Sequence, residues 1–381
     1  MKKIAICTIS SHNYMAYGLT CLLSAKKYNS DVDLYYLVAD RYDECNYEEY
    51  NEIISFIDLK DLDITNEMMV NMEFKYNIVE FNTSVKPSFY KFLFSKGYES
   101  VIYLDPDIEC YASFDSFLNR NKNHSIIVTP HKMSTSPSEL IEDKAFLNNG
   151  IYNLGFIALN RSESTDKFLT WWDEKLRNQC FIDYSTGLAT DQIWVELAST
   201  IFDGFYVERD MGLNVAFWNI HERKLYKNKE WFIDDTPLIF FHFSSLSKNC
   251  SCDLLKKIEQ INPGFEIFYQ EHISNVNEIE TRFDKIPYAF SEFNNGEMIT
   301  KEMRWLYGFS EYLQKNYASP FDTEGNSFYK NILSSHRINK KNVYGSEKIL
   351  KLIIFVFGVK RTLKLLSIGS IHAIKRVAEL Y

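Results

Sequence analysis

The stretch Ser100–Tyr111, SVIYLDPDIECY, is a run of strand-forming residues that ends on two aspartates separated by one proline. The apolar residues from Val101 to Leu104 predict a buried β-strand. Asp105 and Asp107 follow at the carboxyl end of this strand, which is the edge where open α/β sheets bind their ligands. Two carboxylates at positions i and i+2 can hold one divalent cation, although Asp and Pro are also common in solvated turns.

The segments around this strand alternate between strand and helix patterns. Residues 3–9 (KIAICTI) and the stretch DVDLYYLVAD are typical of β-strands, and YMAYGLTCLLSAKKY between them has apolar residues at helical spacing. Strand, helix and strand in this order require a right-handed crossover and parallel pairing. Further strands are expected at SIIVTP, GFIALN and PLIFFHF, and helices at KPSFYKFLFSKGY, STDKFLTWWDEKL and TDQIWVELAS. The sequence therefore predicts an α/β fold in which helices and a sheet form a layered sandwich.

The composition is typical of a folded protein in a reducing compartment. Hydrophobic residues make up 46% and aromatic residues 16% of the 381 residues, which excludes extended disorder. The seven cysteines are odd in number, and the one close pair, Cys250 and Cys252, lacks the spacing of a CxxC motif. Because MKKIAICTI runs directly into a predicted strand, we expect no signal peptide and a cytoplasmic protein.

Charge divides the chain into an acidic body and a basic tail. The net charge is -9, yet the residues after His336 contain ten Lys or Arg and two acids. We expect an α/β unit at residues 1–250, a helical extension at 251–345 and a basic tail at 346–381. The apolar run Leu352–Val359 is too short to cross a bilayer, so the tail is expected to lie on an anionic membrane surface as an amphipathic helix. The alternative is a helix packed on the body or on a second subunit. This arrangement does not favour nucleic-acid binding.

Polar residues also follow other predicted strands. FFHFSSLSK places His242 at the end of an apolar strand, with Lys248 six residues later. The histidine can complete a carboxylate–imidazole metal site and the lysine can neutralise a leaving phosphate, whereas a lone histidine at a strand end is more often structural. Asp191 and Gln192 begin a predicted helix, where N-capping is the ordinary explanation. Asn153, in YNLGFIALN, is explained equally well by a turn.

These motifs resemble those of GT-A glycosyltransferases, most closely the retaining bacterial galactosyltransferases of family eight. VIYLDPDI is similar to the family's D-x-D strand, and HFSSLSK to its His–x–x–Gly–x–x–Lys element. The resemblance implies that Asp105, Asp107 and His242 bind Mn²⁺ (or Mg²⁺), and that Asp105 and Lys248 contact the donor diphosphate. It further implies three residues beside the transferred sugar and the reacting carbon: Asn153, Asp191 and Gln192.

The N-terminal part carries a second portion of the resemblance. TISSHNYMAY is similar to the family's nucleotide loop, which implies that Thr8, Ser10 and Asn13 contact the base and ribose. Asp40, at the end of the second strand, is a further candidate. VKPSFYKFLF differs from the Arg-bearing helix of the family, and Lys86 is expected to take over its phosphate contact.

The resemblance covers residues 3 to 250 and implies the GT-A fold, an α/β fold with a Rossmann-like mixed sheet sandwiched by helices. It also implies a metal-dependent, retaining glycosyltransferase. It would use a nucleotide sugar, with UDP as the nucleotide, and a glycan or lipid-linked acceptor at the inner face of the cell membrane. PYAFSEFNNGEMITKEMRWLYG and SPFDTEGNSFYKNIL resemble the C-terminal part of bacterial surface-polysaccharide glycosyltransferases. Ser245 in place of glycine, and the absence of Pro–Trp after Lys248, leave an inactive GT-A scaffold protein as the alternative. A haloacid-dehalogenase phosphatase is disfavoured, because its aspartate pair normally ends the first strand.

Overall fold

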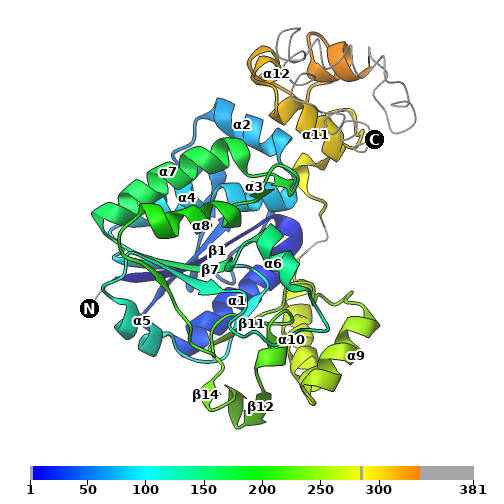
Figure 1. Ribbon diagram of the computed structural model, residues 1–381. Coiled ribbons are helices and arrows are strands. Elements are labelled where there is room, and N and C mark those ends of the chain that lie inside the picture. The colour runs from blue at the N-terminus through cyan, green and yellow to red at the C-terminus, as the bar shows by residue number, and fades with distance from the viewer. Residues whose placement is uncertain (1–2, 284–285, 335–381) are drawn as a thin grey trace. The chain divides into compact units, whose positions relative to one another are not determined.

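The computed structural model describes residues 3–283 and 286–334, and the chain forms two compact units (Figure 1). Each unit is built from two separate stretches of sequence. The first unit comprises Met1–Asp63 and Asn82–Tyr288, and the second comprises Ile64–Phe81 and Ala289–Tyr381. The basic tail expected at 346–381 lies outside the described residues. Within the described residues, no helix is both long enough and apolar enough to cross a membrane.

The first unit is built around a seven-stranded sheet with the strand order β10-β6-β7-β4-β1-β2-β3. β7 runs antiparallel to both of its neighbours, whereas the other pairs in this sheet are parallel. A mixed sheet with helices on its faces confirms the α/β fold expected from the sequence (Figure 1). The strands are β1 (Ile4–Ser10), β2 (Asp33–Val38), β3 (Ile54–Asp58), β4 (Ser100–Leu104), β6 (Ile126–Pro130), β7 (Tyr152–Asn160) and β10 (Phe205–Val207).

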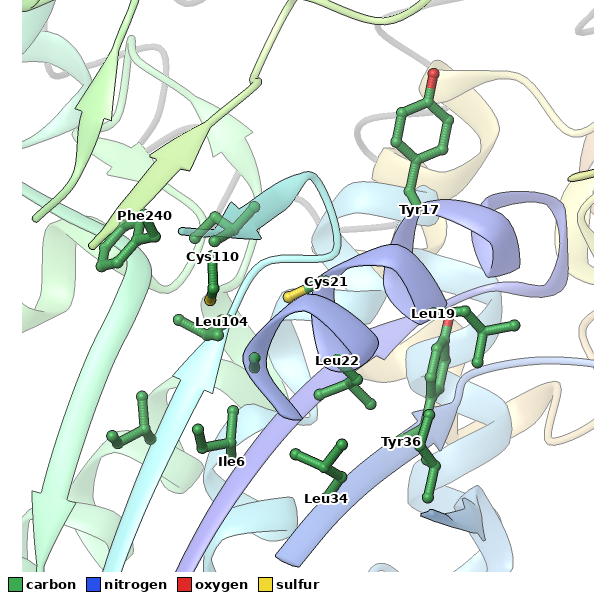
Figure 2. Close-up of a cluster of buried hydrophobic side chains, with 14 of the residues drawn as sticks. Ile6, Tyr17, Leu19, Cys21, Leu22, Leu34, Tyr36, Leu104, Cys110 and Phe240 are labelled. Atoms are coloured by element: carbon green, nitrogen blue, oxygen red, sulfur yellow. The ribbon is translucent and has the colours of Figure 1, made fainter. Parts of the chain in front are cut away.

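Helix α1 (Met15–Tyr28) connects β1 to β2 and covers one face of the sheet. Figure 2 shows Leu19 and Leu22 of this helix above Ile6 and Leu34 of the two strands. Burial of these side chains is worth about 1.5–3 kcal/mol each and holds the crossover on the sheet. On the other side of the sheet lie α4 (Lys86–Ser95), α7 (Glu163–Gln179) and α8 (Gln192–Ile201) (Figure 1).

A smaller sheet of three strands pairs the segment that ends at His242 with the segment that follows the D-x-D motif. β15 (Phe240–His242) lies between β11 (Val215–Ala216), to which it is parallel, and β5 (Ile108–Cys110), to which it is antiparallel. A hairpin of three strands precedes it along the chain. Other elements of this unit are α5 (Asp115–Asn121), α6 (Asp143–Asn149), β8 (Ile182–Asp183), β9 (Leu188–Ala189), β12 (Leu225–Asn228), β13 (Glu230–Ile233) and β14 (Thr236–Pro237).

The compact units do not begin and end at the boundaries expected from the sequence. α9 (Cys252–Ile261) and α10 (Phe265–Glu280) belong to the first unit, although they follow residue 250. Their apolar faces pack on the strand ends, where Phe268 of α10 contacts Phe241 and Phe243. Aromatic packing on the small sheet therefore makes these helices part of the same core.

The second unit joins α2 (Asn66–Lys75) to α11 (Lys301–Gly308) and α12 (Glu311–Asn316), and the boundary with the first unit falls within α3 (Ile78–Ser84). Phe74 is fully buried and packs edge-on against Tyr307 and Phe328. Arg304 of α11 donates to the carbonyl oxygens of Phe74 (2.6 Å) and Tyr76 (2.9 Å), and also to that of Phe290. One buried guanidinium thus satisfies the carbonyls at the end of α2.

Replacing Glu73 of α2 by glutamine should stabilise the protein only at neutral and alkaline pH. Burial raises the pKa of Glu73 to about 7. The folded state therefore loses stability as pH rises from the ordinary glutamate pKa of about 4.3 to about 7, and no more above that. Glu73→Gln should add about 1 to 3 kcal/mol at pH 8 and nothing at pH 4. Thermal denaturation at both pH values tests this, with the exposed Glu67→Gln on the same helix as control. An equal gain at both pH values would contradict it.

Candidate metal centre and its surroundings

Three side chains from two distant segments converge beside the carboxyl end of β4. Asp105 and Asp107 follow that strand, and His242 ends β15. Antiparallel pairing of β5 with β15 places Ile108 opposite His242, so the segment after β4 and the histidine are brought together. Nε2 of His242 lies 3.0 Å from Oδ1 of Asp107 and 3.8 Å from Oδ2 of Asp105. The three residues expected as metal ligands therefore form one cluster.

The cluster has the dimensions and donor chemistry of a divalent-cation site. Its three ligand atoms all lie within 4.8 Å of one another, which suits metal–ligand bonds of about 2.0–2.3 Å to one shared ion. Burial alone would lower the pKa of His242, but the carboxylate of Asp107 outweighs it and the pKa is raised. A cation and a proton thus compete for the imidazole nitrogen that faces the carboxylates.

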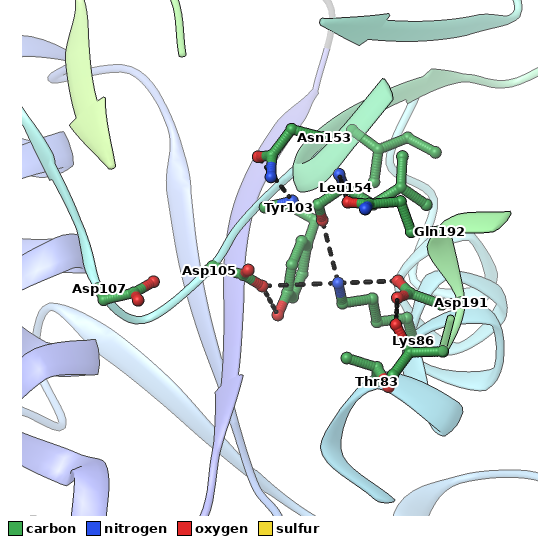
Figure 3. A network of polar contacts seen from close by, with 12 residues as sticks. Thr83, Lys86, Tyr103, Asp105, Asp107, Asn153, Leu154, Asp191 and Gln192 are labelled. Atoms are coloured by element: carbon green, nitrogen blue, oxygen red, sulfur yellow. Dashed lines mark hydrogen bonds and ion pairs between the residues drawn. The ribbon is translucent and has the colours of Figure 1, made fainter. Parts of the chain in front are cut away.

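A buried lysine lies between two carboxylates next to this cluster (Figure 3). Nζ of Lys86, whose side chain is 1% exposed, is 2.9 Å from Asp191 and 3.5 Å from Asp105. It also donates to the carbonyl of Leu154 (3.0 Å) and lies 4.2 Å from the ring centroid of Tyr103. Burial opposes the charge, but Asp105 and Asp191 raise the pKa of Lys86 above its usual value, so the ammonium group stays charged.

Asp191 is held in place by this lysine. Its side chain makes no capping hydrogen bond to α8, so the ordinary N-cap explanation does not apply. The preceding Thr190 has a φ of 53°, a left-handed conformation that β-branched residues rarely adopt. Burial raises the pKa of Asp191, although Lys86 acts in the opposite direction. The backbone at Thr190 is therefore strained at the point where a buried carboxylate faces the site.

An irregularity in β7 directs several polar groups into the site. Val128 of β6 pairs with Ile157, whereas the next residue, Thr129, pairs with Asn153, so three residues of β7 bulge out between them. The bulge presents the Leu154 carbonyl to Lys86 and contains Gly155. Bulges commonly re-aim side chains beside functional sites.

Asn153 and Gln192 are both fixed by this bulge. Oδ1 of Asn153 lies 3.2 Å from Nδ1 of His242, so this residue contacts the histidine of the cluster from within β7 rather than from a turn. The side chain of Gln192 accepts from the Leu154 N–H (3.0 Å) and donates to the Asn149 carbonyl (2.6 Å). Both residues lie beside the Lys86–Asp191 pair in Figure 3.

Two residues of the site were not predicted from the sequence. The hydroxyl of Tyr103 donates to Asp105 (2.7 Å), and Nε2 of His131 lies 3.2 Å from Nδ2 of Asn153. Burial lowers the pKa of His131 to about 4. A signal for His131 did exist, because it directly follows β6, whose end lies at the same sheet edge as the end of β4.

The residues expected to contact the base and ribose lie at the ends of β1 and β2. Thr8 is buried in β1, and its hydroxyl makes no hydrogen bond within the described part of the chain. Ser10 is also buried, whereas Asn13 is exposed in the short helix that follows. Asp40 accepts from the backbone N–H of His12 (2.6 Å) and so shapes the loop. Nucleotide contact by these residues stays a prediction.

Lys248 forms an ion pair with an acidic residue that was not predicted from the sequence. Its ammonium group forms an ion pair with Glu280 of α10, and both side chains are partly exposed. In the loop before it, Ser245 has a φ of 62°, the conformation in which glycine is favoured. Ser245 therefore forms a turn of the kind that glycine favours. Diphosphate contact by Lys248 stays a prediction.

Comparisons with known proteins give one curated relative and several solved structures. No family model matches the chain. The relative, described as "Uncharacterized protein YfnD" of Bacillus subtilis (strain 168), is 24% identical over 307 residues, which cover 78% of this chain and 95% of the relative.

The similar solved structures are described as glycosyltransferases. Galactosyltransferase LgtC, in complex with donor and acceptor sugar analogs, has 14% identity and a TM-score of 0.45, over 74% of this chain and 97% of its own. GlyE of Streptococcus pneumoniae TIGR4 has 14% identity and a TM-score of 0.42, over 77% and 67%. The bifunctional WbbM has 14% identity and a TM-score of 0.41, over 74% and 52%. At such identities and TM-scores the function has to be inferred from the chemistry of the site.

Proposed function

We propose that the chain is a metal-dependent glycosyltransferase that moves a sugar from a nucleotide-sugar donor to an acceptor. The observation that carries this proposal is the cluster of Asp105, Asp107 and His242 directly beside the buried Lys86–Asp191 pair. A divalent cation bound by the cluster would neutralise the charge that develops on a departing nucleotide diphosphate.

The side chains next to the cluster supply the remaining chemistry. A transferred sugar passes through an oxocarbenium-like state, and the carboxylate of Asp191 can stabilise its positive charge. Lys86 holds that carboxylate in place, and its positive charge favours the ionised form against the effect of burial. Gln192, with both ends of its amide bonded to backbone, positions the bulge of β7 at the sugar. Because these groups are buried, their electrostatic effect is larger than it would be in water.

We further propose UDP as the nucleotide and retention of the anomeric configuration, both by motif resemblance. Thr8, Ser10, Asn13 and Asp40 would bind the base and ribose, and Lys248 the diphosphate after it leaves Glu280. The acceptor is a glycan or a lipid-linked glycan of a surface polysaccharide. The composition of residues 346–381 supports attachment at the inner face of the cell membrane.

Replacing Asp107 by asparagine should remove metal-dependent nucleotide binding. Calorimetric titration of UDP into the wild-type protein is expected to show binding with Mn²⁺ and at least tenfold weaker binding with a chelator. In Asp107→Asn the two affinities should be equal, because one charged ligand is lost and the ion is no longer held. Asp115→Asn, which removes an exposed carboxylate of α5, should behave as wild type.

Two outcomes would overturn the proposal. One is UDP binding that is equally tight with Mn²⁺ and with the chelator in the wild-type protein. The other is the absence of binding for every common nucleoside diphosphate in the presence of Mn²⁺ or Mg²⁺.

A further inference from the structure

Two imidazole rings and one amide form a continuous chain that ends at the metal cluster. His131 follows β6, Asn153 lies in the neighbouring β7, and His242 ends β15. The Asn153 side chain lies between the two rings, 3.2 Å from Nε2 of His131 and 3.2 Å from Nδ1 of His242. All three residues are at least 93% buried, so bulk water has little access to these side chains.

The orientation of the amide follows from the backbone around it. The N–H of Gly155 lies 3.2 Å from Oδ1 of Asn153 and can only donate. The oxygen of the amide must therefore face Gly155 and His242, and the nitrogen must face His131. The bulge in β7 thus determines which end of Asn153 each histidine meets.

This orientation determines the tautomer of both histidines. The amide nitrogen only donates, so Nε2 of His131 must accept and its proton resides on Nδ1. The amide oxygen only accepts, so Nδ1 of His242 must carry a proton. Nε2 of His242 is then the nitrogen left to face Asp107 and Asp105, at 3.0 and 3.8 Å. Metal-binding histidines commonly donate their other N–H to such an acceptor.

His131, at the end of this series of contacts farthest from the metal cluster, is held in place by its backbone and by a neighbouring ring. His131 donates its backbone N–H to Ile151 (2.9 Å), and its carbonyl accepts from Asn219 (3.0 Å). The ring of Trp218 lies 5.5 Å from that of His131 and 5.2 Å from that of His242, edge-on to both. One indole therefore packs against both imidazoles and limits their rotation.

We propose that His131 and Asn153 are positioning residues that present Nε2 of His242 to the divalent cation. The role rests on the proposed function, since it assumes that the cluster binds a metal. His131 acts through the amide and makes no contact with the cation itself. Loss of such an outer partner typically weakens metal binding about 10- to 100-fold.

The test is a titration of the protein with Mn²⁺ in the absence of nucleotide, in which electron paramagnetic resonance measures the concentration of free Mn²⁺. His131→Leu removes the acceptor for the Asn153 amide and should weaken Mn²⁺ binding about 10- to 100-fold. His131→Gln keeps an acceptor oxygen and should restore affinity to within about threefold of wild type. His124→Leu replaces a histidine near the other end of β6 and should leave the affinity unchanged.

A second measurement uses the wild-type protein and therefore does not require that a variant folds. Long-range ¹H–¹⁵N spectra of the wild-type protein should show His131 as the neutral tautomer protonated on Nδ1. A proton on Nε2 of His131 would overturn the proposal, because the amide could not then donate to that atom. So would an affinity of His131→Leu within twofold of wild type, or equal losses in the Leu and Gln variants.

The titration also separates this inference from the proposed function. If the wild-type protein binds no Mn²⁺ or Mg²⁺, the metal-dependent function falls and the positioning role falls with it. If the wild-type protein binds Mn²⁺ and the His131 variants bind it equally well, only the positioning role is overturned.

Discussion

Replacing Lys86 by methionine is expected to lower the free energy of unfolding by about 3–5 kcal/mol at neutral pH, as for other broken buried ion pairs. Methionine fills the same space, but Asp191 would be left buried without a countercharge and the Leu154 carbonyl without its donor. Sugar transfer should fall at least a thousandfold, because Asp191 would take up a proton and lose its negative charge. Urea denaturation followed by tryptophan fluorescence measures the first effect.

A lysine on the same helix provides the matched control. Lys91 forms an ion pair with Asp173 at 2.7 Å, but it is partly exposed and Asp173 keeps Arg177 as a second partner at 2.9 Å. Lys91→Met should therefore cost less than about 1 kcal/mol. Because burial already raises the pKa of Asp191, the cost of Lys86→Met should shrink as the pH falls and Asp191 takes up a proton. Equal costs for the two variants would contradict this account.

Replacing Gly155 by alanine is expected to abolish measurable Mn²⁺ binding, a loss of more than about 100-fold. A Cβ atom at this position would lie 2.7 Å from Nδ1 of His242 and 2.8 Å from Oδ1 of Asn153, closer than non-bonded atoms approach. The ring of His242 would have to rotate, which moves its Nε2 away from the two aspartates. Titration of Mn²⁺ into the purified variant measures the loss.

Gly18 of α1 allows packing damage to be separated from damage to the site. A Cβ atom there would lie 2.6 Å from the ring of Tyr36, in the core beneath α1. Gly18→Ala should lower the melting temperature and leave the Mn²⁺ affinity unchanged. If Gly155→Ala bound Mn²⁺ as tightly as Gly18→Ala, the position of the His242 ring would not determine the metal affinity of the cluster.

Local pattern was sufficient to predict five of the seven strands of the main sheet and the residue types of the site, but not the two edge strands, β3 and β10. The apolar run before Asp105 and the one before His242 both form strands, and their polar ends meet. Lys86 was expected to contact a phosphate, and in the structure its ammonium group contacts two carboxylates. Strand ends are identifiable because the change from apolar to polar residues is local in the sequence.

Other features could not be predicted from the local sequence because they depend on contacts between residues far apart in the chain. The pairing of Lys248 with Glu280 and the chain from His131 to His242 join residues with no common periodicity. Thr190 adopts a left-handed conformation without the glycine that would have indicated it. The units likewise follow contacts between segments far apart in the chain, so the composition change after residue 250 did not reveal them.

The split origin of the second unit has a consequence for how the protein is made. α2 leaves the ribosome long before α11, since more than 200 residues separate them. At about 5–20 residues per second, Phe74 waits roughly 10 to 45 s for the aromatic partners that bury it. During translation the apolar side of this helix therefore lacks its packing partners until the C-terminal stretch emerges.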